Sequence, residues 1–412
     1  MSNRSLQGSF GEIQFDAGDA EDAFSEMVRF AHDLRASDLY VLTDQKAVSI
    51  AIRHLGILKP VTFLDRPAGK RIINFVKAAA GMDVVQTQHP QDGRLVYAVD
   101  EEAGVDLRIN TIPSLYGEDM TLRLLSRQMA LLGLENLGLS HRELGNVKGL
   151  LNNPGGLLLV TGPSGAGKTT TLYGCLNYLN NGSRKINTIE DPVEYAIAGI
   201  RQSTVNPHIK LDFPELLRAI LRQSPDVIMV GEIRDPVTAE TAVRAANTGH
   251  LVLATLHAPV AAAAIDSMLA LGVHPHFLST CLLGVLTQRL VRTLCLECRT
   301  AYDISDSPHT FDDIHDRIER DQGQNIYSAP GCPSCFHEGY TGRTAVFEIL
   351  PSSKEIRRLV ADGATVREIR DQSVAEGMLD MRRAALLKVA EGITSTEEIL
   401  RVIPTEHLDP EA

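Results

Sequence analysis

Residues 157–174, with the sequence LLLVTGPSGAGKTTTLYG, constrain the fold of this chain more than any other stretch. The apolar residues Leu157–Val160 predict a buried strand of a parallel sheet, and Thr170–Leu179 can continue as a helix. The segment between them fits the pattern G-x-x-x-x-G-K-[ST] with Gly162, Pro163, Ser164, Gly165, Ala166, Gly167, Lys168 and Thr169. A glycine-rich turn can match this pattern by accident, but the flanking strand and helix favour a nucleotide-binding loop.

The residue types of this loop suit a bound nucleotide. Its glycines let backbone N–H groups curl around a β-phosphate, and the start of the helix adds partial positive charge. Lys168 would reach the β- and γ-phosphates, and the hydroxyl of Thr169 would hold Mg²⁺. The loop therefore predicts a magnesium-bound nucleotide as the ligand.

Three further strands are predicted after this loop, and polar side chains follow each of them. The strands cover Ile186–Ile189, Asp226–Val230 and Leu251–Thr255, and predicted helices lie between them. Alternation of this length implies an α/β fold in which helices cover both faces of a parallel sheet. Such sheets bind ligands at the edge where the carboxyl ends of the strands lie. We therefore expect the polar residues at these strand ends beside the phosphate loop.

Two glutamates at this edge are candidates for the chemistry of hydrolysis. That reaction needs acidic residues near Mg²⁺ and a group that orients or deprotonates the attacking water. Glu194 and Glu232 are the candidates, whereas Glu190 and Asp191 are weaker because the proline turn after them can point them elsewhere. His257 alone would indicate a structural histidine, but at this strand end we expect it to sense the γ-phosphate.

Four of the six cysteines form two C-x-x-C pairs separated by 33 residues; they are Cys295, Cys298, Cys332 and Cys335. Each pair can form a knuckle that offers two thiolates, so the pattern predicts a structural, tetrahedral zinc site. A redox pair is the alternative, but a reducing cytosol and the presence of two pairs count against it. The other two cysteines, Cys175 and Cys281, lie in apolar surroundings and are expected in the core.

The composition limits the partners and the location of the chain. A formal net charge of −12 disfavours nucleic acid or an anionic membrane as the main partner. The absence of tryptophan and a 5% aromatic content argue against an aromatic surface for stacking bases. The start of the sequence lacks the apolar core of a signal peptide, and no stretch is apolar enough for a membrane span. We therefore expect a cytoplasmic protein without membrane insertion.

The coarse pattern divides the chain into six parts. Helical spacing over 22–34 and 70–80, a turn at Pro90–Gly93 and strands over 94–99, 105–110 and 120–125 predict a small α+β domain. The C-terminal region has capping-box patterns at Ser352, Thr365 and Thr394. The predicted parts are a lead-in (1–20), a PAS-like α+β domain (21–126), a linker with a helix (127–150), the nucleotide-binding core (151–291), a zinc module (292–347) and a helical region (348–412).

Several motifs in order resemble one known family. They are GPSGAGKTTTLY, TIEDPVEY, LRQSPDVIMVGEIRD, TGHLVLATLH, GVLTQRL, the two C-x-x-C pairs and GYTGRTAVFEIL. This succession is similar to the type II secretion and type IV pilus assembly ATPases over about residues 22–400. The segments PQDGR, DLRINTIPSLYGED and TLRLL match the domain that precedes the catalytic core in that family.

The resemblance implies a RecA-like P-loop core and a ring of six copies that hydrolyses ATP with Mg²⁺. Hydrolysis would drive pilin or pseudopilin assembly, with inner-membrane platform proteins as partners and a peripheral place on the cytoplasmic side. It also implies Glu194 as the acidic-box carboxylate, Glu232 as the Walker B carboxylate and His257 as the histidine-box residue. The longer members carry an extra N-terminal domain, and about 20 residues precede the shared region here. How the ring is recruited therefore stays open.

The resemblance further implies a set of nucleotide-binding residues outside the loop core. Thr170 completes the loop, and the family's phosphate-facing arginines match Arg108, Arg123, Arg218, Arg222, Arg234 and Arg343. Some of them would reach the γ-phosphate across a domain or subunit boundary, as an arginine finger does. Each could instead belong to an ordinary surface ion pair.

Alternative functions remain at this stage. Within the same enzyme class, the chain could be a retraction ATPase of type IV pili or a conjugation-type secretion ATPase, although the four cysteines disfavour both. From other classes, it could be a nucleic-acid motor, a zinc-bearing binding module or an inactive member of a ring. Retention of Lys168, Thr169, Glu194 and Glu232 argues against the inactive member.

Overall fold

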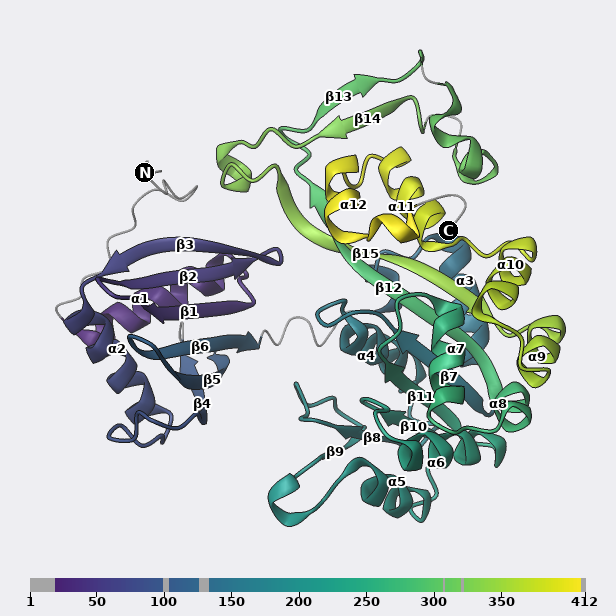
Figure 1. Ribbon diagram of the computed structural model, residues 1–412, viewed down its shortest axis with the longest axis horizontal. Helices are drawn as coiled ribbons and strands as arrows, with labels where there is room; N and C mark the ends of the chain where they lie inside the picture. Colours follow the sequence, from purple (N-terminus) through teal and green to yellow (C-terminus); the bar gives the residue numbers. More distant parts are fainter. Residues whose placement is uncertain (1–18, 99–103, 126–132, 307, 320–321, 409–412) are drawn as a thin grey trace. The chain divides into compact units, whose positions relative to one another are not determined.

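The computed structural model describes residues 19–98, 104–125, 133–306, 308–319 and 322–408 (Figure 1). By its internal contacts the chain divides into two compact units. The smaller unit is Met1–Arg127 with Gly331–Glu338, and the larger unit is Gln128–Pro330 with Gly339–Ala412. The finer six-part division expected from the sequence stays a prediction. None of the described helices combines the length and the apolar character that a membrane crossing requires.

The smaller unit is a six-stranded antiparallel sheet with strand order β3-β2-β1-β6-β5-β4. Its elements are α1 (Ala20–Asp33), β1 (Asp38–Thr43), β2 (Val48–His54), β3 (Ile57–Leu64), α2 (Arg66–Ala79), β4 (Gln91–Ala98), β5 (Gly104–Ser114) and β6 (Gly117–Leu125). Phe24, Met27 and Val28 of α1 are buried in the same apolar cluster as the inward side chains of the strands. Because burial alternates along β5, one face of this sheet joins the core and the other presents polar side chains.

One turn predicted in this unit is wrong. The pattern at Pro90–Gly93 predicts a turn, but β4 already begins at Gln91. Gly93 pairs with Ile109 of β5 inside the ladder, where a Cβ atom would approach Met82 to 2.9 Å. The glycine thus permits close packing within a strand, which the local sequence cannot distinguish from a turn.

The larger unit contains a seven-stranded sheet with strand order β15-β12-β7-β11-β10-β8-β9. Its strands are β7 (Gly156–Thr161), β8 (Ile186–Glu190), β9 (Arg201–Thr204), β10 (Val227–Val230), β11 (Leu251–Leu256), β12 (Leu282–Leu294) and β15 (Tyr340–Pro351), and a separate pair is formed by β13 (Thr300–Asp303) and β14 (Asn325–Ser328). Its α-helices are α3 (His141–Leu151), α4 (Lys168–Leu179), α5 (Phe213–Leu221), α6 (Pro236–Asn247), α7 (Ala261–Ala270), α8 (Pro275–Cys281), α9 (Lys354–Ala361), α10 (Val366–Ala375), α11 (Met381–Ala390) and α12 (Thr396–Val402). Short 3₁₀ turns are η2 (Leu134–Asn136), η3 (Pro207–Ile209), η4 (Pro308–Arg317), η5 (Pro333–Cys335) and η6 (Thr405–His407), of which η5 belongs to the smaller unit.

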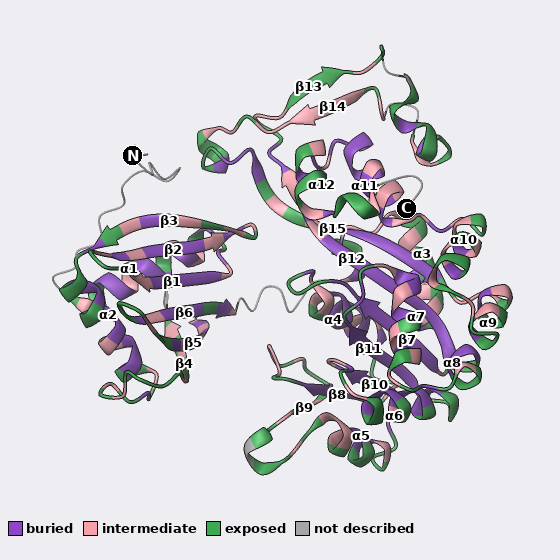
Figure 2. Ribbon diagram, in the orientation of Figure 1, coloured by how far each residue is buried: buried purple, intermediate pink, exposed green. Residues whose placement is uncertain are grey.

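Helices cover both faces of the central strands, as the α/β prediction requires (Figure 2). Along β7, Leu157 and Leu159 join the apolar cluster shared with α5 to α8, whereas Leu158 and Val160 join the one shared with α3 and α4. All six residues of β7 are buried, which explains its nearly continuous apolar sequence. Cys175 and Cys281 lie in these cores, as predicted.

The four strands predicted around the phosphate loop are parallel, as expected, but one edge of the sheet is antiparallel. β12 runs parallel to β7, but β15 pairs with β12 in the antiparallel direction from Gly284↔Pro351 to Leu294↔Tyr340. These two long strands were not predicted, because leucine, glutamine and arginine in β12 favour helix as readily as strand. Pairing with distant strands therefore decides their conformation.

The C-terminal helices α11 and α12 pack against the β12–β15 pair, whereas α9 and α10 pack against α8 and α7 (Figure 1). Val291 and Val346 of these strands share an apolar cluster with Met381 and Ala385 of α11. The capping box at Thr365 is confirmed, since its hydroxyl accepts from the N–H of Glu368. The other two predicted caps are displaced by one residue, to Ser353 and Ser395. Adjacent hydroxyl residues leave a local pattern ambiguous by one position.

Candidate nucleotide-binding site and cysteine cluster

The predicted phosphate loop joins the end of β7 to the first residue of α4, Lys168. Gly167, the N-cap of α4, has a left-handed backbone with φ of 86°. Gly162 has φ of 142°, and a Cβ atom there would collide with the carbonyl oxygen of Gln288. The loop therefore requires glycine at both positions, and it ends at the start of a helix, where backbone N–H groups are free to bind an anion.

Four neighbouring parallel strands bring the predicted polar residues to one edge of the sheet. The order β7-β11-β10-β8 places the phosphate loop, His257, Glu232 and Glu194 after successive neighbours. Each residue follows the carboxyl end of its strand, as expected for an α/β ligand site. The sequence alone could not give this strand order.

Direct contacts connect five of the predicted residues. The Nζ atom of Lys168 donates to the carbonyl oxygen of Gly162 at 2.8 Å and lies 3.5 Å from Nδ1 of His257. The Nε2 atom of His257 lies 2.9 Å from Oε1 of Glu232. Arg234 then approaches the other carboxylate oxygen, Oε2, to 2.6 Å. A continuous polar chain thus runs from the phosphate loop to the Glu232 carboxylate.

This polar chain sets the charge state of its members. Partial burial opposes ionisation of Glu232, but Arg234, His257 and Lys168 outweigh it and hold the pKa of this carboxyl below its ordinary value. Burial lowers the pKa of Lys168, and the Glu232 charge opposes that change. A carboxylate that stays ionised beside a lysine suits the binding of Mg²⁺ or the orientation of a water molecule.

Backbone contacts hold the loops that carry these side chains. The hydroxyl of Thr161, directly before the phosphate loop, donates to the carbonyl oxygen of Ala258 and accepts from its N–H, both at 2.8 Å. The N–H of Ile233 donates to the carbonyl oxygen of Thr255 at 2.9 Å. The His257 and Glu232 loops are therefore tied to neighbouring strand ends, which limits their freedom to move apart.

The two glutamates of the TIEDPVEY segment take different positions. Glu190 is buried and accepts hydrogen bonds from the side chains of Tyr173, Thr188 and Gln202. Burial, followed by the Glu190 carboxylate, raises the pKa of Tyr173. Glu190 therefore braces α4 against β8, consistent with its lower rank in the sequence prediction. Glu194 is half-buried in the loop after β8.

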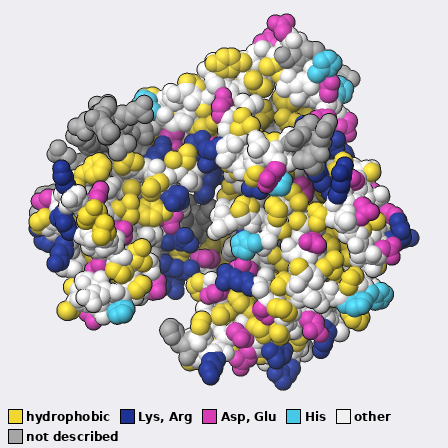
Figure 3. Space-filling model, in the orientation of Figure 1, with side chains coloured by type: hydrophobic (Ala, Val, Ile, Leu, Met, Phe, Trp, Pro, Cys, Tyr) yellow, Lys and Arg dark blue, Asp and Glu magenta, His cyan; other side chains and the backbone are white. Residues whose placement is uncertain are grey.

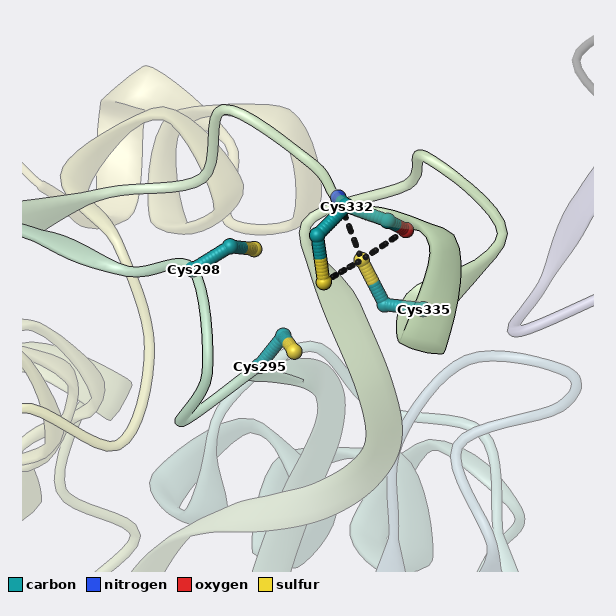
Figure 4. Close-up of side chains that lie close together, drawn as sticks. All are labelled: Cys295, Cys298, Cys332 and Cys335. Carbon is teal, nitrogen blue, oxygen red and sulfur yellow. Dashed lines mark hydrogen bonds between the residues drawn. The ribbon is translucent and has the colours of Figure 1, made fainter.

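The four predicted zinc ligands lie together (Figure 4). Their sulfur atoms are within 4.8 Å of one another, and all four cysteines are free of disulfides. The Sγ atoms of Cys332 and Cys335 are 3.7 Å apart, close to the spacing of about 3.8 Å in a tetrahedral site with Zn–S bonds near 2.3 Å. The donor set and its spacing therefore fit a structural zinc ion.

Strand pairing brings the two cysteine pairs together. Cys295 follows the last residue of β12, and its N–H donates to the carbonyl oxygen of Gly339, directly before β15. The 33 residues between the pairs contain β13, η4 and β14. A wide separation in sequence is thus compatible with one compact cluster.

The smaller unit carries a row of arginines on the polar face of its sheet. Arg94, Arg108 and Arg123 are direct cross-strand neighbours on β4, β5 and β6, and the row continues through Asp38 to Arg53. The Nε atom of Arg123 donates to Asp38 at 3.1 Å, yet 61% of the Arg123 side chain is exposed. Like charges on directly opposed residues are unfavourable, and the carboxylates of Asp106, beside Arg94, and Asp38, beside Arg123, offset part of this repulsion.

Comparison with known proteins places these features in a family. The sequence model of the family described as "Type II/IV secretion system protein" matches residues 14–401. The type II secretion system ATPase E of Vibrio cholerae is 41% identical over 367 residues, which are 89% of this chain and 72% of the relative. The type IV pilus assembly ATPase PilB of Thermus thermophilus is 39% identical over 391 residues, 94% of this chain and 43% of the relative.

The chain belongs to the type II/IV secretion system protein family. The crystal structure of the pilus retraction motor PilT with bound ADP aligns with this chain at a TM-score of 0.62 and 26% sequence identity. The alignment covers 94% of this chain and 97% of the PilT chain. The resemblance and the fold class inferred from the sequence are thereby confirmed. Within this family, the phosphate loop and its polar chain make the protein a P-loop ATPase.

The remaining predicted arginines lie on other parts of the larger unit. Arg218 is exposed on α5, where its Nε donates to the carbonyl oxygen of Pro214, and Arg222 is exposed at the C-cap of that helix. Arg343 is exposed on β15 and pairs in register with Arg292 of β12. Among the predicted arginines of this unit, Arg234 is the one that the described ion pairs join to Glu232.

Sequence reasoning missed one residue of the loop's surroundings. Gln288 of β12 is buried, and its Nε2 donates to the carbonyl oxygen of Ala166 at 2.6 Å. Its own backbone packs against Gly162. The signal was present in the motif GVLTQRL, but that motif served only to indicate the family. Without the pairing of β12 with β7, nothing places this glutamine under the loop.

Proposed function

We propose that this protein is the ATP-hydrolysing motor of a type II secretion or type IV pilus assembly system. The observation that carries the proposal is the polar chain from Lys168 through His257 to Glu232 beside a phosphate loop. Lys168 binds the β- and γ-phosphates, and Thr169 holds Mg²⁺ together with water and nearby carboxylates. The remaining loop residues, including Thr170, surround the phosphates with backbone N–H groups.

Glu232 and Glu194 share the acidic work of hydrolysis in this proposal. Glu232 is kept ionised by its cationic neighbours, so it can hold the hydrated Mg²⁺ and orient the attacking water. Glu194 follows the adjacent strand and approaches the same edge from the other side of β10. His257 contacts both Lys168 and Glu232, so the presence or absence of the γ-phosphate at Lys168 can change the position of the Glu232 carboxylate through this histidine.

The arginine row of the smaller unit supplies further positive charge in a ring of six copies. Arg108 and Arg123 stand side by side on a sheet face that lies away from their own core. We propose that they stabilise the γ-phosphate of a neighbouring subunit in the manner of an arginine finger. Arg218, Arg222, Arg234 and Arg343 are proposed as additional phosphate contacts, and Arg234 has the strongest support because it already pairs with Glu232.

The cysteine cluster has a structural role in this proposal. Zinc held by four thiolates is coordinatively closed, so it would fix the knuckles at the ends of β12 and β15. The cluster also favours assembly or secretion over retraction, since retraction ATPases usually lack these cysteines. The 41% and 39% identical relatives, named as a secretion ATPase and a pilus assembly ATPase, support the same choice.

The proposed partners are proteins of an inner-membrane platform, and the proposed location is the cytoplasmic side of that membrane. On the larger unit, the face seen in Figure 3 has basic side chains interspersed with acidic and apolar ones. Together with the net charge of −12, this mixture supports a protein partner over nucleic acid. Single-stranded DNA should accordingly leave ATP turnover unchanged.

A mixing experiment tests both the site and the ring. Lys168→Ala should abolish ATP turnover, and Arg123→Ala should reduce it strongly. The control Lys185→Ala replaces an exposed lysine of the larger unit, which also holds Lys168, and should retain turnover. If Arg123 acts on a neighbouring subunit, an equimolar mixture of the two inactive variants should recover about a quarter of the wild-type rate, because some sites combine two intact residues. Normal turnover by Lys168→Ala would refute the site, and a mixture without recovery would refute catalysis across subunits.

A further inference from the structure

Glu348 of β15 is a fully enclosed carboxylate outside the nucleotide site. It is only 3% exposed and lies opposite Thr287 of β12. Its two oxygens accept hydrogen bonds from two separate segments of backbone. Oε1 accepts from the N–H of Ala261 at 2.6 Å, and Oε2 accepts from the N–H of Met381 at 2.9 Å.

Both donors are first residues of helices. Ala261 begins α7, whose N-cap residue, Val260, makes no side-chain capping bond. Met381 begins α11, whose N-cap residue, Asp380, caps the N–H of Arg383 instead. The first N–H groups of a helix have no partner within the helix and carry partial positive charge. A single carboxylate therefore caps two helices and holds their starts together.

The Ala261 contact leads directly to the nucleotide site. Three residues separate Ala261 from His257, and one of them, Ala258, is held by the hydroxyl of Thr161. The segment 258–261, directly after His257, is consequently held at both ends. Thr161 holds it to the start of the phosphate loop, and Glu348 holds it to β15.

The Met381 contact leads to the C-terminal helices. Met381 is buried in the apolar cluster that joins α11 to Val291 and Val346 of the β12–β15 pair. A connected path therefore runs from Thr161 to Ala258 by hydrogen bonds, along the backbone to Ala261, and by hydrogen bonds through Glu348 to the first residue of α11. The hydrogen bonds in this path are buried. Displacement of the His257 loop would pull on a carboxylate that also holds α11.

We propose that Glu348 is a positioning residue for ATP hydrolysis, which fixes the His257 loop and couples it to α11. This inference rests on the proposed role of His257 as the γ-phosphate sensor. Glu348 does not touch the nucleotide; it acts through the loop that it anchors. The same anchor transmits the nucleotide state of the site to the C-terminal helices.

The first test is Glu348→Gln. Glutamine has nearly the same volume but offers one oxygen, so its amide N–H₂ must face one of the two backbone donors. We expect kcat to fall about 10- to 100-fold, because a small displacement of a reacting group has an effect of this size. The KM for ATP should change less than about threefold, because Lys168 and the phosphate loop are untouched.

Glu398→Gln is the matched control. Glu398 is equally buried, on α12, and its carboxylate accepts from the N–H of Arg292 and pairs with Arg401. Its loss perturbs the same helical region without touching the His257 loop, so kcat should stay close to wild type. An equal fall in kcat for the two variants, or wild-type kcat in folded Glu348→Gln, would overturn the proposal.

A double-mutant cycle separates positioning from general stability. If Glu348 acts through His257, Glu348→Gln should have little further effect on kcat in a His257→Ala background. An undiminished effect there would show that it acts by another route and overturn the proposal. Should Glu348→Gln fail to fold, Ala261→Pro removes the loop-side donor at a helix position that accepts proline, after an extended Val260. It should reproduce the selective fall in kcat, and wild-type kcat in this variant would contradict the proposal.

Hydrogen exchange tests the coupling to α11. In the wild type, Mg²⁺ with the non-hydrolysable analogue AMP-PNP should change exchange at the first-turn amides of α11. Glu348→Gln should lose this response and Glu398→Gln should keep it. Identical responses in the two variants would refute the coupling. A wild type without any turnover would instead refute the proposed function, so the two failures are distinguishable.

Discussion

Replacement of Glu232 by glutamine tests the centre of the proposed site. The substitution removes one negative charge from contacts at 2.6 Å with Arg234 and 2.9 Å with His257. These two partners have side chains that are 66% and 53% exposed, so each pair contributes at most about 1 kcal/mol to folding. Loss of both pairs costs at most about 2 kcal/mol, so the melting temperature should fall by no more than about 4–8 °C.

The effect on catalysis should be much larger than the effect on stability. Loss of a carboxylate that orients the attacking water lowers kcat by about 10²- to 10⁴-fold. Binding of ATP should be retained or strengthened, because Lys168 and Arg234 keep their charges and an opposing negative charge is gone. Glu232→Gln should thus give a protein that is folded and binds nucleotide but hydrolyses it slowly.

Glu240→Gln provides the matched control for this measurement. Glu240 pairs with Arg244 at 2.8 Å on the exposed surface of α6, with both side chains about 70% exposed. ATP titrations by a phosphate-release assay, together with thermal melts, should show similar stability but a difference in kcat between the two variants. Loss of nucleotide binding in Glu232→Gln, or equal kcat in both variants, would refute the assigned role.

Three further outcomes are expected. Cys332→Ser should release about one zinc per chain and destabilise the β12–β15 end, whereas Cys175→Ser should keep the metal; unchanged metal content measured by atomic emission would contradict the zinc assignment. Gln288→Leu removes the donor that holds Ala166, so the KM for ATP should rise about two- to tenfold, and an unchanged KM would show that this bond does not position the loop. The kcat of wild type divided by that of Glu232→Gln should stay constant from about pH 5 to 8 and should decrease only below the ordinary glutamate pKa of 4.5. The reason is that the lowered pKa of Glu232 keeps this carboxylate charged until more acidic pH. A decrease of this ratio near neutral pH would contradict the charged state of Glu232.

Local sequence determined the phosphate loop and the elements around it. Glycine at positions with left-handed or crowded backbone, a buried strand before the loop and a helix after it are properties of adjacent residues. The same holds for Asp235 and Pro236, a residue pair typical of a helix start, which cap and begin α6. Capping, turn and propensity energies act over a few residues, so a single sequence suffices to read them.

Tertiary structure decided which distant residues meet. The pairing of β12 with β7 and the position of Gln288 under the phosphate loop join residues more than 100 positions apart. The edge strand β15 pairs with β12, whose residue types favour helix as readily as strand. The sequence also ranked Glu190 below Glu194, but it did not show that the hydroxyl of Tyr173 donates a hydrogen bond to the Glu190 carboxylate. Nothing near Glu348 in the chain indicates that it caps two helices.

The division has a physical cause. Backbone geometry and helix caps depend on neighbours along the chain. Strand order and buried hydrogen bonds depend instead on which distant segments pack together and exclude water between them. The residue types of the site were therefore determined by the sequence. Their assembly into one polar chain from Lys168 to Arg234 was decided by the packing of four parallel strands, which brings their carboxyl ends to a common edge.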